Sequence, residues 1–155
     1  MTAGPFPVLI QTPQSYVGGS GILLLPTGPS AGTAVPTGAA NTFGAWTQLA
    51  AAATEDDLIL GIALTTFQVV ANGIYVECQI GVGGVGAEVA IAAVRASQQW
   101  VTAAGVMALG AIMLPIPVRV ASGARIAARV ADVLAATDSI SVSLLYAKQS
   151  DLIAF

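Results

Sequence analysis

Short segments in which apolar and polar residues alternate recur along most of the chain, and this pattern constrains the fold more than any other feature. From residue 74 to residue 82, apolar side chains occupy every second position, and Tyr75, Glu77 and Gln79 fall between them. Successive side chains of a β-strand point to opposite faces, so the pattern indicates a strand with one buried face. Asn72-Gly73 precedes this segment and favours a tight hairpin turn.

Similar segments follow one another at short intervals along the chain. We expect further strands within residues 22–25, 43–49, 58–70, 87–95, 116–120, 125–130 and 140–146. About eight strands separated by turn residues predict an all-β fold, specifically an antiparallel β-sandwich. Residues 87–99 are rich enough in alanine that a helix is the alternative there.

The N-terminal third differs from the rest, because no charged side chain occurs before Glu55. Residues 1–21 contain three prolines and a Gly-Gly-Ser-Gly cluster, which resist regular structure and favour an extended arm. Residues 26–42 contain Pro-Thr-Gly twice, in a segment typical of a long loop. We therefore expect an extended N-terminal arm and loop, residues 1–42, followed by a β-sandwich domain, residues 43–155.

Charged side chains make up only 8% of the chain, against about 25% in an ordinary soluble domain. Five basic and eight acidic residues give a net charge of −3. A folded monomer of this mass exposes roughly 7,000 Å², and so few ions leave wide uncharged areas that tend to associate. We therefore expect the chain to bury much of its surface against partners. Nucleic acid is not expected among them, because the sequence has no basic cluster.

The residue types that carry most enzyme chemistry are scarce. The chain has no histidine, and its one cysteine, Cys78, excludes an intrachain disulfide and a multi-cysteine zinc site. We expect no catalytic residue, no cofactor and no metal, with Cys78 a buried small hydrophobe. Gly81, Gly83 and Gly86 have the spacing of a dinucleotide-binding turn, but the acidic residue that should follow is missing. The N-terminus lacks the basic start of a secretory signal, so synthesis in a reducing cytoplasm is expected.

Two segments have both a functional and a structural interpretation. Residues 96–118 carry no charge and are long enough to cross a bilayer, but glycines and prolines interrupt them. We expect buried strands and a loop there, and no membrane contact. Glu55-Asp56-Asp57 is expected to form a solvated turn and not a calcium site, because adjacent side chains diverge.

The charged residues of the second half also allow two interpretations. Arg125 and Arg129 share a strand face, with Arg119 nearby in sequence. We expect them to pair with acids such as Glu77 or Glu88, within the subunit or across an interface, and binding of an anion or glycan is the alternative. The two glutamates could act on a sugar only if they lay about 5–10 Å apart across a cleft, and the sequence does not indicate this.

Two segments carry a family resemblance. Residues 80–88 are Ile-Gly-Val-Gly-Gly-Val-Gly-Ala-Glu, and residues 115–129 are Pro-Ile-Pro-Val-Arg-Val-Ala-Ser-Gly-Ala-Arg-Ile-Ala-Ala-Arg. Together with Trp46, which precedes an acidic turn, they resemble the IGvGaaGsE and PIPIrIPAGsRIAaR segments of small β-sandwich virion proteins from tailed bacteriophages. The resemblance spans residues 43–147 and departs at Ala121, where the pattern often has proline. It implies a jelly-roll-like sandwich, a capsid decoration (cement) role, assembly as oligomers that are often trimers, and no catalytic residues.

Composition and resemblance lead to one functional hypothesis. We expect a structural protein on the outer surface of a virion capsid that contacts the major capsid protein and copies of itself, as a homotrimer. Residues 1–42 would dock onto a neighbour and become ordered only on assembly. The alternatives are a tail- or fibre-associated module that binds host glycans and a small membrane protein. The interface residues we expect are Phe6, Tyr16, Trp46, Trp100, Arg119, Arg125 and Arg129.

Overall fold

The computed structural model describes residues 22–26, 32–68, 74–98, 106–107, 110–133 and 139–152, and the structural statements below refer to these. They form ten strands and one short helix: β1 (Leu23–Leu25), β2 (Thr33–Pro36), β3 (Thr47–Ala50), β4 (Asp57–Gln68), β5 (Ile74–Val82), β6 (Val89–Gln98), β7 (Val106–Met107), β8 (Gly110–Val120), β9 (Ile126–Asp132), β10 (Ser139–Lys148) and α1 (Gln149–Leu152). The predicted all-β class is confirmed.

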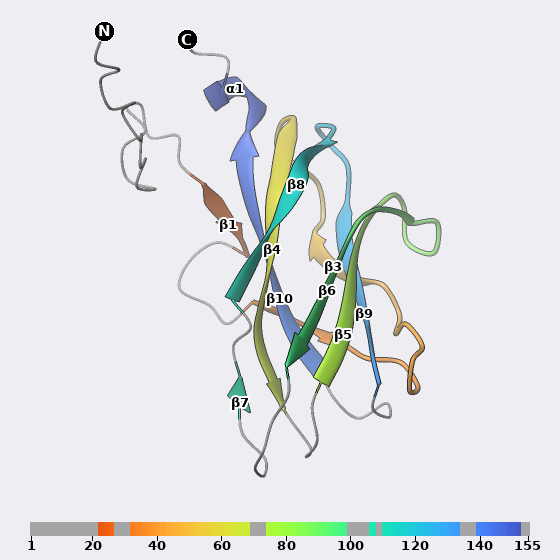
Figure 1. The fold of residues 1–155 in the computed structure, drawn as a ribbon. Coiled ribbons are helices and arrows are strands. Elements are labelled where there is room, and N and C mark those ends of the chain that lie inside the picture. The colour runs from red at the N-terminus through yellow and green to blue at the C-terminus, as the bar shows by residue number, and fades with distance from the viewer. Residues whose placement is uncertain are drawn as a thin grey trace, which may run out of the picture.

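The strands form two antiparallel sheets that lie face to face (Figure 1). In sheet A, β10 pairs with β4 on one side and with β1 and β2 on the other, and β4 also pairs with β7 and β8. Sheet B has the order β3-β9-β5-β6. The main strands therefore run β2-β10-β4-β8 opposite β3-β9-β5-β6, with the chain crossing between the sheets at almost every step. This is the strand order of a jelly roll, which agrees with the expected fold.

The core lies between the two sheets, and alternation builds it along β5, β9 and β10, whereas β4 changes its buried positions at a register shift between Ile59 and Gly61. Ile59, Ile62 and Leu64 of β4 are fully buried, and so are the core-facing side chains of β5, β9 and β10. Cys78 of β5 is one of these residues. Burial raises the pKa of its thiol to about 12, so it remains a protonated, unreactive hydrophobe, as predicted.

The predicted domain boundary at residue 42 is too late for the described part of the N-terminal segment. β1 pairs with Leu144–Tyr146 and β2 pairs with residues 139–142, both on the same side of β10. Val35 of β2 is fully buried in the core. The small and proline residues of this segment favour a loop locally, but the free side of β10 offers ladder hydrogen bonds to any extended segment. Residues 1–21, the predicted arm, lie outside the described residues.

The segments for which the sequence left two interpretations form strands and a turn. Residues 89–98 form β6 and not a helix, and the described part of residues 96–118 belongs to β6, β7 and β8. No helix within the described ranges is long and apolar enough to span a membrane. The glycine-rich segment joins β5 to β6, and Gly83 and Gly86 have left-handed φ values of 134° and 80°, which only glycine adopts easily. A strand follows this turn, so the helix that a dinucleotide-binding turn needs is missing.

Candidate functional site

The outer face of sheet B carries the polar side chains that the alternation on β5 predicted. Tyr75, Glu77 and Gln79 point away from the core, and the residues between them are fully buried. Arg129 of β9 lies opposite Gln79, and Arg95 of β6 lies opposite Glu77. The strand register therefore places two cations, an amide and a carboxylate side by side across three strands.

Arg129 is held between two aromatic rings and an amide. Its guanidinium carbon lies 4.6 Å from the ring centre of Phe43 and 4.5 Å from that of Trp46, which are typical cation–π distances. Its Nε and Nη2 both donate to Oε1 of Gln79, at 2.9 and 2.7 Å. The Trp46 ring also covers Gly81, where an added Cβ would lie 2.6 Å from the ring carbon Cη2. Trp46 and Arg129 thus have partners in their own chain, and their part in an interface stays a prediction.

The loop between β2 and β3 brings these aromatic residues to the sheet. The Gly44 N–H donates to the Val130 carbonyl at 2.9 Å, and the Asn41 N–H donates to the Asp132 carbonyl at 2.6 Å. Asn41 has a φ of 59°, a left-handed conformation that asparagine tolerates better than most residues. These two hydrogen bonds fix the loop along β9. The loop therefore holds Phe43 and Trp46 next to Arg129.

A cavity of about 120 Å³ lies where this loop meets the polar face of sheet B. Glu77 and Asp132 are its acidic members, and Glu77 accepts hydrogen bonds from Arg95 Nε at 2.8 Å and Gln79 Nε2 at 3.1 Å. Tyr75 is 43% exposed, so an aromatic surface lies beside these polar groups. Sequence reasoning missed this cluster, because its aromatic residues come from a loop and from β5. The lining residues are Asn41, Phe43, Tyr75, Glu77, Ala131 and Asp132.

Arg125 and Glu88 form the most buried ion pair among the described residues. Their side chains are 13% and 2% exposed, and Arg125 Nε also donates to Gln48 Oε1 at 3.1 Å. Burial alone would raise the pKa of Glu88, but hydrogen bonds from its own N–H, from Arg125 and from the Gly86 N–H outweigh burial and hold the pKa below its usual value. The expectation that Arg125 pairs with an acid such as Glu88 is confirmed, whereas Arg129, for which an acid was also expected, bonds the amide of Gln79.

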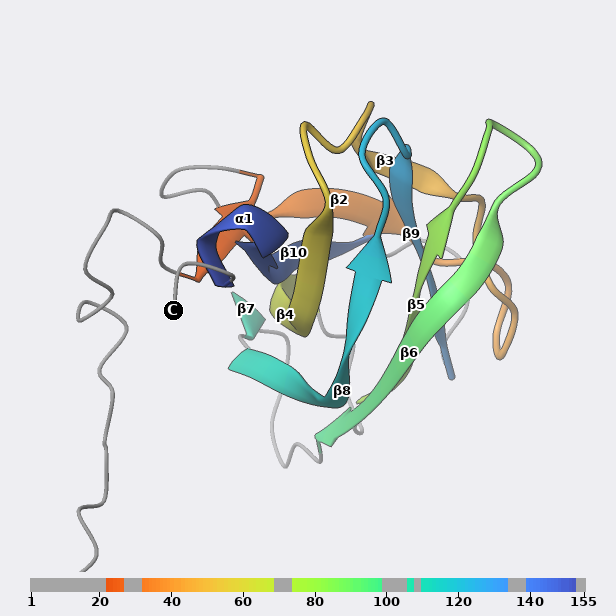
Figure 2. The same cartoon turned by 90° about the horizontal axis from the view of Figure 1, so that it is seen from above.

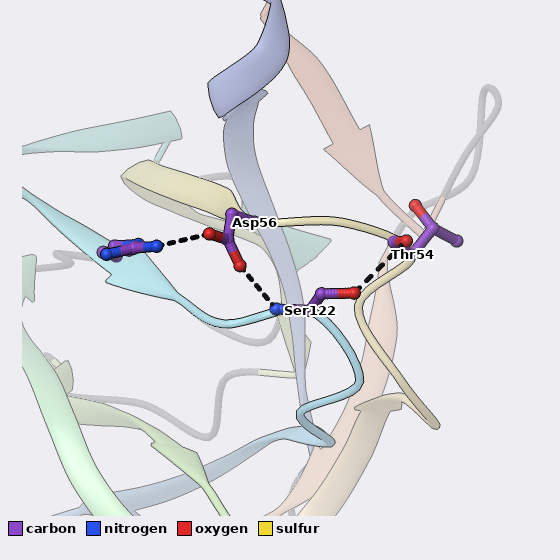
Figure 3. A network of polar contacts seen from close by, with 4 residues as sticks. Thr54, Asp56 and Ser122 are labelled. Carbon is purple, nitrogen blue, oxygen red and sulfur yellow. Dashed lines mark hydrogen bonds and ion pairs between the residues drawn. The ribbon is translucent and has the colours of Figure 1, made fainter.

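Arg119 lies apart from the other two arginines, on β8 in sheet A. It forms an ion pair with Asp56 in the acidic turn before β4 (Figure 3). The other Asp56 oxygen accepts the Ser122 N–H at 2.8 Å, and Ser122 Oγ donates to the Thr54 carbonyl at 3.5 Å. The hydrogen bonds from Arg119 and from the Ser122 backbone hold the pKa of Asp56 below its usual value. This network ties the acidic turn to the β8–β9 turn.

The three acids of the turn diverge, as predicted, but they are not all solvated. Glu55 accepts a hydrogen bond from Lys148 Nζ at 2.6 Å and another from Ser150, and these bonds lower its pKa. Asp57, by contrast, is only 5% exposed, because it begins β4 on the core-facing side. No group of three or more metal-ligating side chains occurs among the described residues.

All five basic residues of the sequence lie in the described part and have partners within the chain. Arg95, Arg119, Arg125 and Lys148 each pair with a different carboxylate, and Arg129 bonds an amide between two rings. A nucleic-acid surface needs clustered cations that are available to phosphates. The structure therefore offers no such cluster, and the expectation that nucleic acid is not a direct partner stays a prediction.

The structure does not bring the other candidate residues together. Glu77 pairs with Arg95 of β6, whereas Glu88 precedes Val89, which lies opposite Val82 at the other end of β5. Five residues of strand span about 16 Å, so the two glutamates are too far apart for a carboxylate pair on a sugar. Phe6, Tyr16 and Trp100 lie outside the described residues.

Exposed apolar side chains lie on β6 and β8, the strands that end the two sheets on one side of the sandwich, and in the turn before β6. β6 and β8 are neighbours there (Figures 1 and 2). Val85 in the β5–β6 turn is 83% exposed, Val89 66%, Met113 53% and Ile116 76%. We call these four residues the β6–β8 edge. Residues 114–117, which include two prolines, stand opposite Leu60 alone, so β8 is bulged at this point.

Comparison with known protein families, curated proteins and solved structures found no match to this chain.

Proposed function

We propose that the protein is a structural virion protein that decorates and stabilises a bacteriophage capsid as a homo-oligomer, the homotrimer that the family resemblance implies. The observation that carries the proposal is the β6–β8 edge. Its four apolar side chains are exposed on two neighbouring strands and the turn before one of them, in a chain with very few charges. Surfaces of this kind are typical of sites that pack against another protein.

The two segments that resemble virion proteins support the proposal from a second direction. Residues 80–88 cover the end of β5 and its turn, and residues 115–129 cover the β8–β9 turn. The Arg125–Glu88 ion pair joins the two segments, and the Gly83 N–H donates to the Arg125 carbonyl at 3.4 Å. The resemblance therefore rests on residues that contact one another and stabilise one end of the sandwich.

A protein that binds an assembled shell, and not its separated subunits, shifts the assembly equilibrium by mass action. The test is to add the purified full chain to capsids that lack it and to measure the copies bound and the temperature at which the shells open. We expect saturation at a fixed, large number of copies and a higher opening temperature. A chain without residues 1–21 keeps every described strand, so we expect it to fold but to bind shells weakly. Binding of only a few copies, at the tail, would overturn the proposal.

A second candidate function is binding of a glycan, and the cavity on sheet B favours it. Carbohydrate sites combine an aromatic surface with hydrogen-bonding groups, and here Tyr75 and Phe43 lie beside Asn41 and Glu77. A screen of the chain against immobilised glycans tests this function, with Tyr75→Ala as the loss-of-binding variant. Decoration predicts that Tyr75→Ala binds shells as the original chain does. A glycan-binding module predicts the loss of a specific glycan signal.

A further inference from the structure

A second cavity, of about 70 Å³, lies between the two sheets at the end beside the acidic turn. Its walls are aliphatic and come from both sheets, and three polar side chains, Thr54, Asp57 and Tyr146, also line it. Ala52 and Thr54 are exposed, so the cavity opens to the surface through them. A volume of about 15 Å³ is enough for one water, so this cavity has room for a small organic group. The aliphatic residues of the wall are Leu25, Ala50, Ala52, Ala53, Ile59, Ile126 and Leu144.

Asp57, which lines this cavity, has an unsatisfied acceptor. Its side chain is almost fully buried, and its Oδ1 atom has no hydrogen-bond partner. A buried carboxylate oxygen without a partner costs free energy, and native structures rarely leave one unexplained. The two ion pairs of the acidic turn do not include Asp57, because Arg119 bonds Asp56 and Lys148 bonds Glu55.

The charges around Asp57 show which kind of group would satisfy it. Burial and the negative charges of Glu55 and Asp56 raise the pKa of Asp57, and the opposing effect of Lys148 is smaller. The same environment acts on Tyr146 of β10, where burial, Asp57 and Glu55 raise the pKa and Lys148 lowers it. A positive charge in the cavity would relieve this excess of negative charge.

The cavity wall decides between a metal ion and an organic cation. Calcium takes six to eight oxygen ligands, and magnesium keeps several waters around it. This cavity offers one carboxylate and two hydroxyls among aliphatic side chains. A primary ammonium on an alkyl chain matches both parts, since its carbons pack on the wall and its N–H groups donate to Asp57.

We propose that the cavity between the sheets binds a primary alkylammonium group, the chemistry shared by a lysine side chain of a partner protein and a free aliphatic amine. The Asp57 Oδ1 atom accepts its N–H, the Tyr146 and Thr54 side chains offer hydroxyl oxygens, and Leu25, Ile126 and Leu144 contact its carbons. This inference does not depend on the proposed capsid role.

The first test uses the unaltered full chain and two probes of the same length and shape. n-Butylammonium chloride is titrated into the protein at constant ionic strength, with binding followed by NMR shifts of the Leu, Ile and Tyr signals, and n-butanol serves as the neutral control. We expect saturable binding of n-butylammonium at millimolar concentration and much weaker binding of n-butanol. Equal binding of the two probes, or no saturable binding of n-butylammonium, would overturn the proposal.

The second test uses a matched pair of variants. Asp57→Asn removes the carboxylate that lines the cavity, and we expect the affinity for n-butylammonium to fall at least about tenfold. Asp56→Asn removes the same charge one residue away, outside the cavity lining, and we expect a much smaller loss. Equal losses would mean that the general negative potential attracts the probe, and would refute a specific site. An acetylated and amidated Gly-Lys-Gly peptide then identifies the source: its binding points to a partner's lysine, and binding of n-butylammonium alone points to a free amine.

Urea unfolding at two pH values tests whether the Asp57→Asn variant is folded and whether its site is altered as expected. The pKa of Asp57 is raised above its ordinary 3.8, so the native state binds more protons than the unfolded state between these two values. Asp57 therefore contributes to the stability of the native state below its ordinary pKa. This contribution is lost as the pH rises through the raised pKa of the native state. Asp57→Asn should therefore raise the midpoint of urea unfolding at neutral pH and not at pH 3. A variant that proves less stable leaves the comparison of n-butylammonium with n-butanol as the deciding test.

Discussion

The outer face of sheet B and the β6–β8 edge meet along β6 but differ in chemistry. The sheet face holds three of the five basic residues, Arg95, Arg125 and Arg129, each bonded to an acid or amide of the same chain. The edge exposes valine, methionine and isoleucine, and Glu88, which follows Val85 closely in sequence, is withdrawn from solvent by Arg125. A chain with few charges therefore groups them: one group lies on the outer face of sheet B, another lies at the acidic turn, and the four residues of the β6–β8 edge carry none.

The largest effect is expected from charges placed on the edge. Val89→Asp combined with Ile116→Asp should raise the dissociation constant for self-association at least about a hundredfold, because burial of each side chain contributes about 1.5–3 kcal/mol. Sedimentation velocity over a range of concentrations measures this change. Ala93→Asp is the matched control, since Ala93 lies on the same strand, is exposed, and stands opposite Gln79 on the polar face. If the control dissociates the oligomer and the double variant does not, the polar face is the interface.

The expected all-β class and the β5 strand follow from local sequence, whereas the jelly-roll-like architecture was expected from the family resemblance. Alternation decides which face of a strand is buried, and β5 has the bounds that its pattern predicted. β2 could not be found in this way, because Thr33–Pro36 is short and ends in proline, and it becomes a strand only by pairing with β10. The hydrogen bonds that make β2 a strand come from β10, so the local sequence of β2 does not predict them.

The candidate sites were less predictable than the fold. Pairing of Arg125 with an acid such as Glu77 or Glu88 was expected, because alternation places these residues on outward-facing positions. The cavity beside Tyr75 needs a loop that crosses from β2 to β3, and the cavity at Asp57 needs both sheets. The burial of Asp57 had no sequence signal, because three consecutive acids favoured a solvated turn.

A smaller effect is expected at the polar face, and it should appear in stability instead of association. Arg129→Ala removes the cation between two rings and its bonds to Gln79, so we expect the free energy of unfolding to fall by about 2–4 kcal/mol. Arg129→Lys keeps the charge without the planar fork, and should lose roughly half as much. Urea unfolding measures both variants. A normal unfolding free energy together with a lost oligomer would show that Arg129 contacts a partner and not its own chain.

The smallest effect is expected where Trp46 lies on Gly81. Gly81→Ala places a methyl group against the indole, so the ring must shift and the unfolding free energy should fall by about 1 kcal/mol. Gly84→Ala is the control, because nothing lies within 4 Å of the added carbon. The same urea experiment separates the two variants. Equal stability of both would mean that the Trp46 ring does not rest on β5.

The bulge in β8 limits how copies of this protein can join. A filament grows without end when each new subunit adds a strand to the free side of the last, and this needs an unbroken row of donors and acceptors. Four residues of β8 stand opposite one of β4 at the bulge, and two of the four are prolines that have no N–H to offer. Copies that meet at this side must therefore associate through side chains, which allows rings of fixed size and discourages fibres.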